Sequence, residues 1–71
     1  MSDDLYVRAG DEDMLRCTIR TVAGAHVASL KGRGEIVWTR RDANGDLVPP
    51  GLYLVVIEYP AGTTVHKVLV R

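Results

Sequence analysis

Several features that are common in other protein classes are scarce or absent in this sequence. Cys17 is the only cysteine, so no disulfide can form within the chain, and the redox compartment is not revealed. The longest uninterrupted apolar run spans residues 52–57, far short of the roughly 20 residues that a membrane helix needs. Residues 1–4 include two aspartates and lack the basic and then apolar stretches of a secretory signal. A disulfide scaffold and a membrane-spanning helix are therefore not expected, and the compartment stays unassigned.

Neither sign of charge is in excess. Nine Lys and Arg residues balance nine Asp and Glu residues, which gives a formal net charge of zero. A nucleic-acid-binding domain usually carries a basic excess, so nucleic acid is not expected as a partner. Aromatic residues are also few, with one tryptophan, three tyrosines and no phenylalanine. The core must therefore be built mainly from aliphatic side chains, and no aromatic residue is left over to stack on bases.

The 71 residues that are present suffice for one small domain. Hydrophobic residues make up 46% of the chain and charged residues 25%, which is typical of folded globular proteins. We expect residues 1–71 to form a single domain. Residues 1–14 would supply an N-terminal strand or arm with an acidic turn, and residues 15–71 the main body.

The spacing of apolar residues favours strands over helices. No window of 11 or more residues places apolar side chains at the intervals of a helix face, and glycine and proline divide the chain into short segments. We predict a flexible connection over residues 31–34 and a hairpin loop over residues 60–63. Strands are expected at residues 5–8, 15–20, 26–30, 35–38, 52–59 and 64–71. The predicted fold is a small all-β, Ig-like or fibronectin-like antiparallel β-sandwich of six or seven short strands.

Two of these strands have informative patterns. Leu15, Cys17 and Ile19 alternate with polar residues, which predicts a half-buried strand whose inner face includes the thiol. Residues 52–59 are apolar on both faces except at Glu58. Such a segment is expected to be a central strand with one face in the core and the other at least partly covered.

The longest polar stretch, residues 39–46, follows Trp38 and contains the turn-forming dipeptide Asn44-Gly45. Trp38 is expected to lie at the centre of the core, with Asp42 accepting hydrogen bonds from loop amides and pairing with Arg40 or Arg41. The residues expected to hold this corner are Trp38, Arg41, Asp42, Gly45, Pro49, Gly51 and Tyr53. Asp42, Asn44 and Asp46 alternate as calcium ligands do, but no bidentate glutamate follows, so an Asx-type turn is preferred to a metal site.

Residues 35–53 resemble the Ig-like domain of the flagellar hook-capping protein and related C-terminal modules of secreted bacterial proteins. Thr39 and Arg40 stand where this family usually has Asp and Gly. The matching positions are Trp38, Arg41, Asp42, Gly45, Val48, Pro49, Gly51 and Tyr53. The resemblance covers about residues 15–71. It implies an Ig-like sandwich used for assembly, adhesion or anchoring, and it carries over no catalytic residue.

No constellation in the sequence points to catalysis or to a cofactor. Cys17 is interpreted as a small buried apolar residue rather than a nucleophile. His26 and His66 lie on different predicted strands without a further ligand at a known spacing, so polar positions are preferred to a metal site. Nucleophile–base pairs and paired carboxylates are not recognisable. We therefore expect no enzymatic activity, no cofactor and no metal.

The charges are unevenly distributed along the chain. Five acidic residues lie within residues 3–13, whereas six basic residues lie between residues 16 and 41. This asymmetry could orient identical subunits head to tail, or simply reflect solvated faces. The residues singled out for contact with a partner are Leu5, Tyr6, Val7, Arg8, Arg16 and Arg20.

The expected function is a non-catalytic structural or interaction module. Its partners would be proteins, in a homo-oligomer or a larger bacterial or phage assembly such as a filament, appendage or shell. The resemblance places such an assembly at the cell surface or outside the cell. The alternative is a C-terminal anchoring or sorting domain taken from an exported bacterial protein. A small-molecule or nucleic-acid binder is the third possibility.

Overall fold

The structure is a computed structural model that describes residues 5–8 and 14–71. Its elements are β1 (Leu5–Arg8), β2 (Met14–Thr21), β3 (His26–Arg33), β4 (Glu35–Trp38), β5 (Gly51–Tyr59) and β6 (Gly62–Val70). All pairings between these strands are antiparallel. The prediction of an all-β chain with six or seven short strands is thus confirmed.

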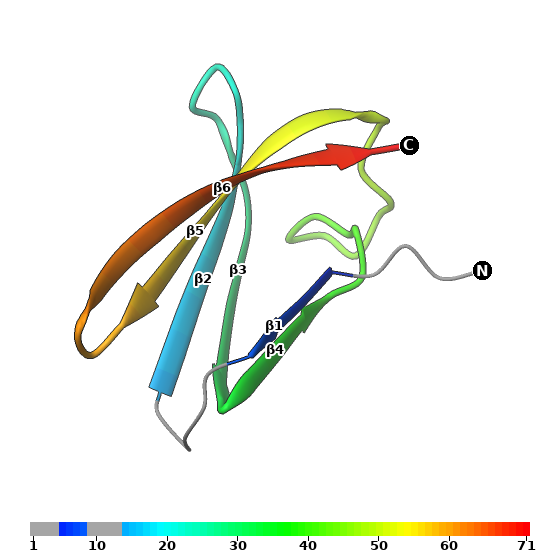
Figure 1. Cartoon of the computed structure of the whole chain (residues 1–71). Coiled ribbons are helices and arrows are strands. Elements are labelled where there is room, and N and C mark those ends of the chain that lie inside the picture. The colour runs from blue at the N-terminus through cyan, green and yellow to red at the C-terminus, as the bar shows by residue number, and fades with distance from the viewer. Residues whose placement is uncertain (1–4, 9–13) are drawn as a thin grey trace.

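The strands form two sheets of unequal size. Strands β3, β2, β5 and β6 form a four-stranded sheet in that spatial order, and β1 pairs with β4 in a two-stranded sheet. Figure 1 shows the small sheet lying across one face of the large one, as in a β-sandwich. β5 is a central strand, as its double-sided apolar sequence predicted, whereas β6 and β3 are the edges of the large sheet.

The core lies between the two sheets and follows the alternation of the sequence. The side chains of Leu15, Cys17 and Ile19 on β2 are at most 1% exposed, as predicted from their spacing. Trp38 at the end of β4 is 2% exposed and is the largest fully buried side chain. The buried hydrophobic residues in the described part of the chain are Val7, Leu15, Cys17, Ile19, Ala28, Ile36, Trp38, Val48, Tyr53, Val55, Ile57 and Val70.

The prediction of a flexible connection over residues 31–34 is wrong for its first three residues. β3 continues to Arg33, and only Gly34, with φ of 72°, forms the bend into β4. Gly32 is needed within the strand because a Cβ at this position would overlap the carbonyl oxygen of Glu35. The second loop is also shorter than expected, since β6 begins at Gly62 instead of residue 64. Gly32 and Gly62 both belong to strands, whereas the sequence pattern predicted a loop at each of these glycines.

The predicted N-terminal strand is present and pairs within the chain. In β1, Leu5 lies opposite Trp38 and Val7 opposite Ile36, so this segment closes the core on one side. Val7 is 7% exposed, which removes it from the residues available to a partner. The remainder of the predicted arm and acidic turn, residues 1–4 and 9–13, lies outside the described residues.

Candidate functional site

The loop between β4 and β5 is fixed to the core by two buried aromatic residues. The indole Nε1 of Trp38 donates a hydrogen bond of 2.9 Å to the carbonyl oxygen of Arg41. The hydroxyl of Tyr53 donates one of 2.6 Å to the carbonyl oxygen of Pro49. Each aromatic ring therefore contributes apolar surface to the core while its polar atom holds one end of the loop.

Asp42 organises the tip of the same loop as an Asx-type turn. Its Oδ1 accepts hydrogen bonds from the backbone amides of Asn44, at 2.9 Å, and Asp46, at 3.0 Å. Arg41 does not pair with this carboxylate. Its Nη1 donates to the carbonyl oxygen of Gly45 at 2.7 Å instead. The tight turn predicted at Asn44-Gly45 is present, but a single bridge between Arg41 and Leu47 flanks it where strands were expected.

The residues considered as metal ligands are not gathered into a cluster. Asp42 Oδ1 accepts the two amide hydrogen bonds of the turn. Within the described part of the chain, no three His, Cys, Asp or Glu side chains lie close enough together to hold a metal ion. His26 and His66 belong to β3 and β6, at opposite edges of the large sheet, so they do not meet.

Arg40 has an unusual backbone conformation. Its φ of 61° is the only positive value among non-glycine residues that the structure describes. This left-handed region costs an L-residue about 1–2 kcal/mol relative to right-handed conformations. Arg40 stands at the position where the resembling family usually has glycine, the residue best suited to that conformation.

Cys17 is enclosed in the core. Its side chain is fully buried, and burial raises the pKa of the thiol because the apolar surroundings disfavour the thiolate. A nucleophilic cysteine needs the opposite environment, accessible and electropositive. The structure therefore supports the interpretation of Cys17 as a packing residue.

The outer face of the large sheet, which points away from the core, is apolar over much of β5 and β6. Leu52 lies directly opposite Leu69, and Val56 opposite Val65. Leu52 is 42% exposed, while Val65 and Leu69 are each 59% exposed. We call the residues Leu52, Leu54, Val56, Val65 and Leu69 the outer patch. The second face of this strand was expected to be at least partly covered, and Leu54 and Val56 are half-buried there while Leu52 is exposed.

A band of positive charge borders the outer patch on β2 and β3. Arg16 on β2 lies directly opposite Lys31 on β3, and both are exposed. Arg20 lies opposite Leu54 of the patch on the other side of β2. We call Arg16, Arg20, Lys31 and Arg33 the basic band. Arg16 also lies opposite Glu58 of β5, so it has one like-charged and one oppositely charged cross-strand neighbour, and the Lys31 pairing is the unfavourable one.

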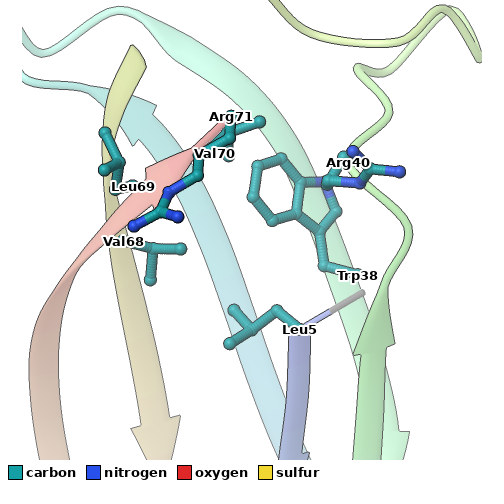
Figure 2. Close-up of a pocket in the computed structure, with 7 residues that line it drawn as sticks. All are labelled: Leu5, Trp38, Arg40, Val68, Leu69, Val70 and Arg71. Carbon is teal, nitrogen blue, oxygen red and sulfur yellow. The ribbon is translucent and has the colours of Figure 1, made fainter. Parts of the chain in front are cut away.

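The side of the sandwich between β1 and β6 is open. No Cα atom of β1 lies within 8 Å of a Cα atom of β6 in the described residues, whereas paired strands lie about 4.7–4.9 Å apart. Two hollows of about 370 and 410 Å³ lie along this side and share Leu5 and Val68. Figure 2 shows the first hollow, with Trp38 and Arg40 facing the C-terminal end of β6 across it. We call the two together the open groove.

The residues predicted to contact a partner are dispersed by the fold. Arg16 and Arg20 lie on the outer face, whereas Leu5, Tyr6 and Arg8 line the open groove. The sequence reasoning did not identify the exposed apolar residues Val65 and Leu69. Their strand mixes polar and apolar residues on both faces, so its alternation gives no signal. The only available signal was on the neighbouring strand, whose residues are apolar on both faces.

No helix with the length and apolar character needed to cross a membrane occurs in the part of the chain described by the structure. No known protein family, curated protein or solved structure matches the chain.

Proposed function

We propose that this chain is a non-catalytic structural module that joins other subunits in a larger bacterial or phage assembly. The observation that carries the proposal is the outer patch on β5 and β6. In an antiparallel sandwich the face turned away from the core is normally polar. Contiguous exposed apolar side chains rimmed by polar residues are instead a mark of protein–protein contact.

The charges beside the patch support the same function and indicate the kind of partner. The outer face carries the four cations of the basic band and Lys67, against the single carboxylate of Glu58. A subunit surface with apolar side chains and carboxylates would complement it. The acidic residues between positions 3 and 13 offer one such charge pattern to a neighbouring copy.

The corner loop supports the Ig-like family as the origin of the module. Trp38, Asp42 and Tyr53, which carry the resemblance to the hook-capping domain, all make the contacts that hold the corner. Arg40 has a glycine-like φ at a position where that family has glycine. A module of this kind serves by presenting faces and edges to neighbours, and it needs no cleft.

The proposal is tested by the native mass of the protein in extracts of its own host. We expect the tagged full chain to migrate in a complex far larger than its own 7.8 kDa. The double variant Leu52→Lys, Val65→Lys should return it to the mass of the free chain, because two charges would be buried without partners. Both side chains are exposed, so folding should be retained, as circular dichroism would verify.

Thr63→Lys is the matched control. Thr63 is exposed on the same face of β6, opposite Glu58, so the substitution adds one lysine charge on that strand outside the outer patch. The control should keep the complex. A wild-type chain that migrates as free monomer, or a complex that survives the double variant, would refute the proposed role of the outer patch.

A further inference from the structure

We propose that the open groove binds an extended peptide segment of a partner protein, which adds a fifth strand to the free edge of β6. The segment would carry alternating apolar side chains and carboxylates at its ends. This inference rests on the proposed function and names a second contact site, which shares only Leu69 with the outer patch.

Two unpaired strand edges border the groove. Among the strands of residues 5–8 and 14–71, β6 pairs only with β5, and β1 pairs only with β4. The nine residues of β6 pair with β5 in an unbroken register from Gly62 to Val70, so the opposite edge is regular along its full length. It contains no proline and no bulge, and Lys67 is its only charged residue among the features that usually protect such an edge. Backbone N–H and C=O groups on this edge can therefore pair with an added strand.

The floor of the groove is apolar. Val55 and Ile57 of β5 lie at its base, and Leu5 and Val68 form the point where the two hollows meet. Successive side chains of a strand point to opposite faces, so every second side chain of an added strand would enter the groove. Hollows of about 370 and 410 Å³ have room for several aliphatic side chains. These features favour an extended segment over a helix, whose apolar stripe follows a different period.

The charged side chains that line the groove are all basic. Arg71 lies at one end of the groove and Arg8 near the other, while Lys67 borders the groove from the outer face of β6, opposite Leu54. Arg8 is within 3.4 Å of Glu35 in an exposed ion pair, but Glu35 is not part of the lining. No Asp or Glu lines either hollow. Carboxylates flanking the apolar residues of the segment therefore match the groove.

The test uses the isotope-labelled full chain and a synthetic peptide, acetyl-Asp-Val-Thr-Val-Thr-Val-Asp-amide, followed by NMR. We expect saturable binding, with shifts concentrated in β1 and β6. Amides of β6 that point away from β5 should become protected from hydrogen exchange. A peptide with lysine in place of both aspartates should bind at least about fivefold more weakly than the aspartate peptide, because each exposed ion pair contributes up to about 1 kcal/mol.

Variants of the chain separate the groove from the outer patch. Leu5→Ser should weaken peptide binding, and Arg71→Glu should do so through charge even if Leu5→Ser fails to fold. Val65→Lys lies on the same strand but outside the groove lining, so it should bind the peptide as the wild type does. Together with Leu52→Lys, the same substitution should nevertheless break the native complex. The two proposals can therefore fail independently.

Three results would overturn the inference. The first is no saturable binding at millimolar peptide. The second is binding whose shifts fall on β3 or on Leu52, Leu54 and Val56 of the outer patch instead of on β1 and β6. The third is a purified chain that dimerises through β6 in competition with the peptide, which would assign the groove to a second copy of this chain.

Discussion

The rings of Trp38 and Tyr53 meet edge to face, with centroids 5.9 Å apart and an interplanar angle of 64°. The pair joins the end of the small sheet to the central strand of the large one. Because both polar atoms also bind the loop between β4 and β5, this contact fixes the sheets and the corner together. Edge-to-face pairs contribute about 0.5–1.5 kcal/mol beyond the apolar area that they bury.

Tyr53→Phe tests the attachment of the corner to the core. The substitution retains the ring contact with Trp38 but removes the 2.6 Å hydrogen bond to Pro49. We expect the free energy of unfolding to fall by about 1–2 kcal/mol, measured by urea denaturation. Tyr6→Phe is the control, since Tyr6 is 57% exposed and should change stability by less than about 0.5 kcal/mol. Equal effects for the two variants would contradict the role of Tyr53.

The conformation of Arg40 predicts an unusual order of stability between two small substitutions. Arg40→Gly and Arg40→Ala both remove the side chain and its contacts, so they differ in backbone preference at φ of 61°. The glycine variant should be more stable than the alanine variant by about 1 kcal/mol in thermal or urea unfolding. At an ordinary strand position the order would be reversed. An alanine variant as stable as the glycine variant would show that the left-handed conformation is not maintained.

The buried thiol predicts a specific loss of stability at alkaline pH. The pKa of Cys17 is raised in the folded state, so the folded chain keeps this proton at pH values where the unfolded chain loses it. The free energy of unfolding contributed by Cys17 is therefore constant below about pH 9 and falls as the pH rises above it.

The measurement compares urea denaturation of the wild type and Cys17→Ala from pH 7 to pH 10.5. The variant should be less stable at neutral pH, but the difference between the two proteins should shrink as the pH rises above about 9. The wild-type thiol should also resist a thiol reagent until the chain is unfolded. Rapid labelling of the folded protein at neutral pH would contradict the enclosed position of Cys17.

The basic band predicts opposite effects on stability and on assembly. Lys31→Glu would place a carboxylate opposite Arg16 in place of a like charge. The isolated chain should become more stable by about 0.2–1 kcal/mol, while the native complex should weaken because the band loses positive charge. Ser29→Glu, on the same strand and face, adds a negative charge without removing a positive one. A Lys31→Glu variant that assembles like the wild type would show that the band does not contact the partner.

The strands could be predicted closely because their alternation has a physical cause in the two-layered core. Leu15, Cys17 and Ile19 had to share a face, and the buried indole of Trp38 had no competitor in a chain without phenylalanine. Gly32 was misinterpreted because close backbone approach to Glu35 depends on how β3 and β4 cross, which local sequence does not specify.

The candidate surfaces were less predictable than the strands. Whether Val65 faces the core or solvent depends on the register between β5 and β6, and the open groove depends on the distance between β1 and β6. Both are consequences of pairings between distant residues. The apolar outer side of β5 was foreseen, but its exposure follows from the small sheet covering only the opposite face.

The central claim is that the outer patch contacts another subunit, and photo-cross-linking in the native host tests it most directly. A photo-reactive amino acid in place of Val65 would be compared with the same residue in place of Ser29, which is also exposed on the outer face. The account predicts an efficient cross-link of defined mass from position 65 and a weaker one from position 29. A chain that remains uncross-linked at position 65 while the complex is intact would contradict it.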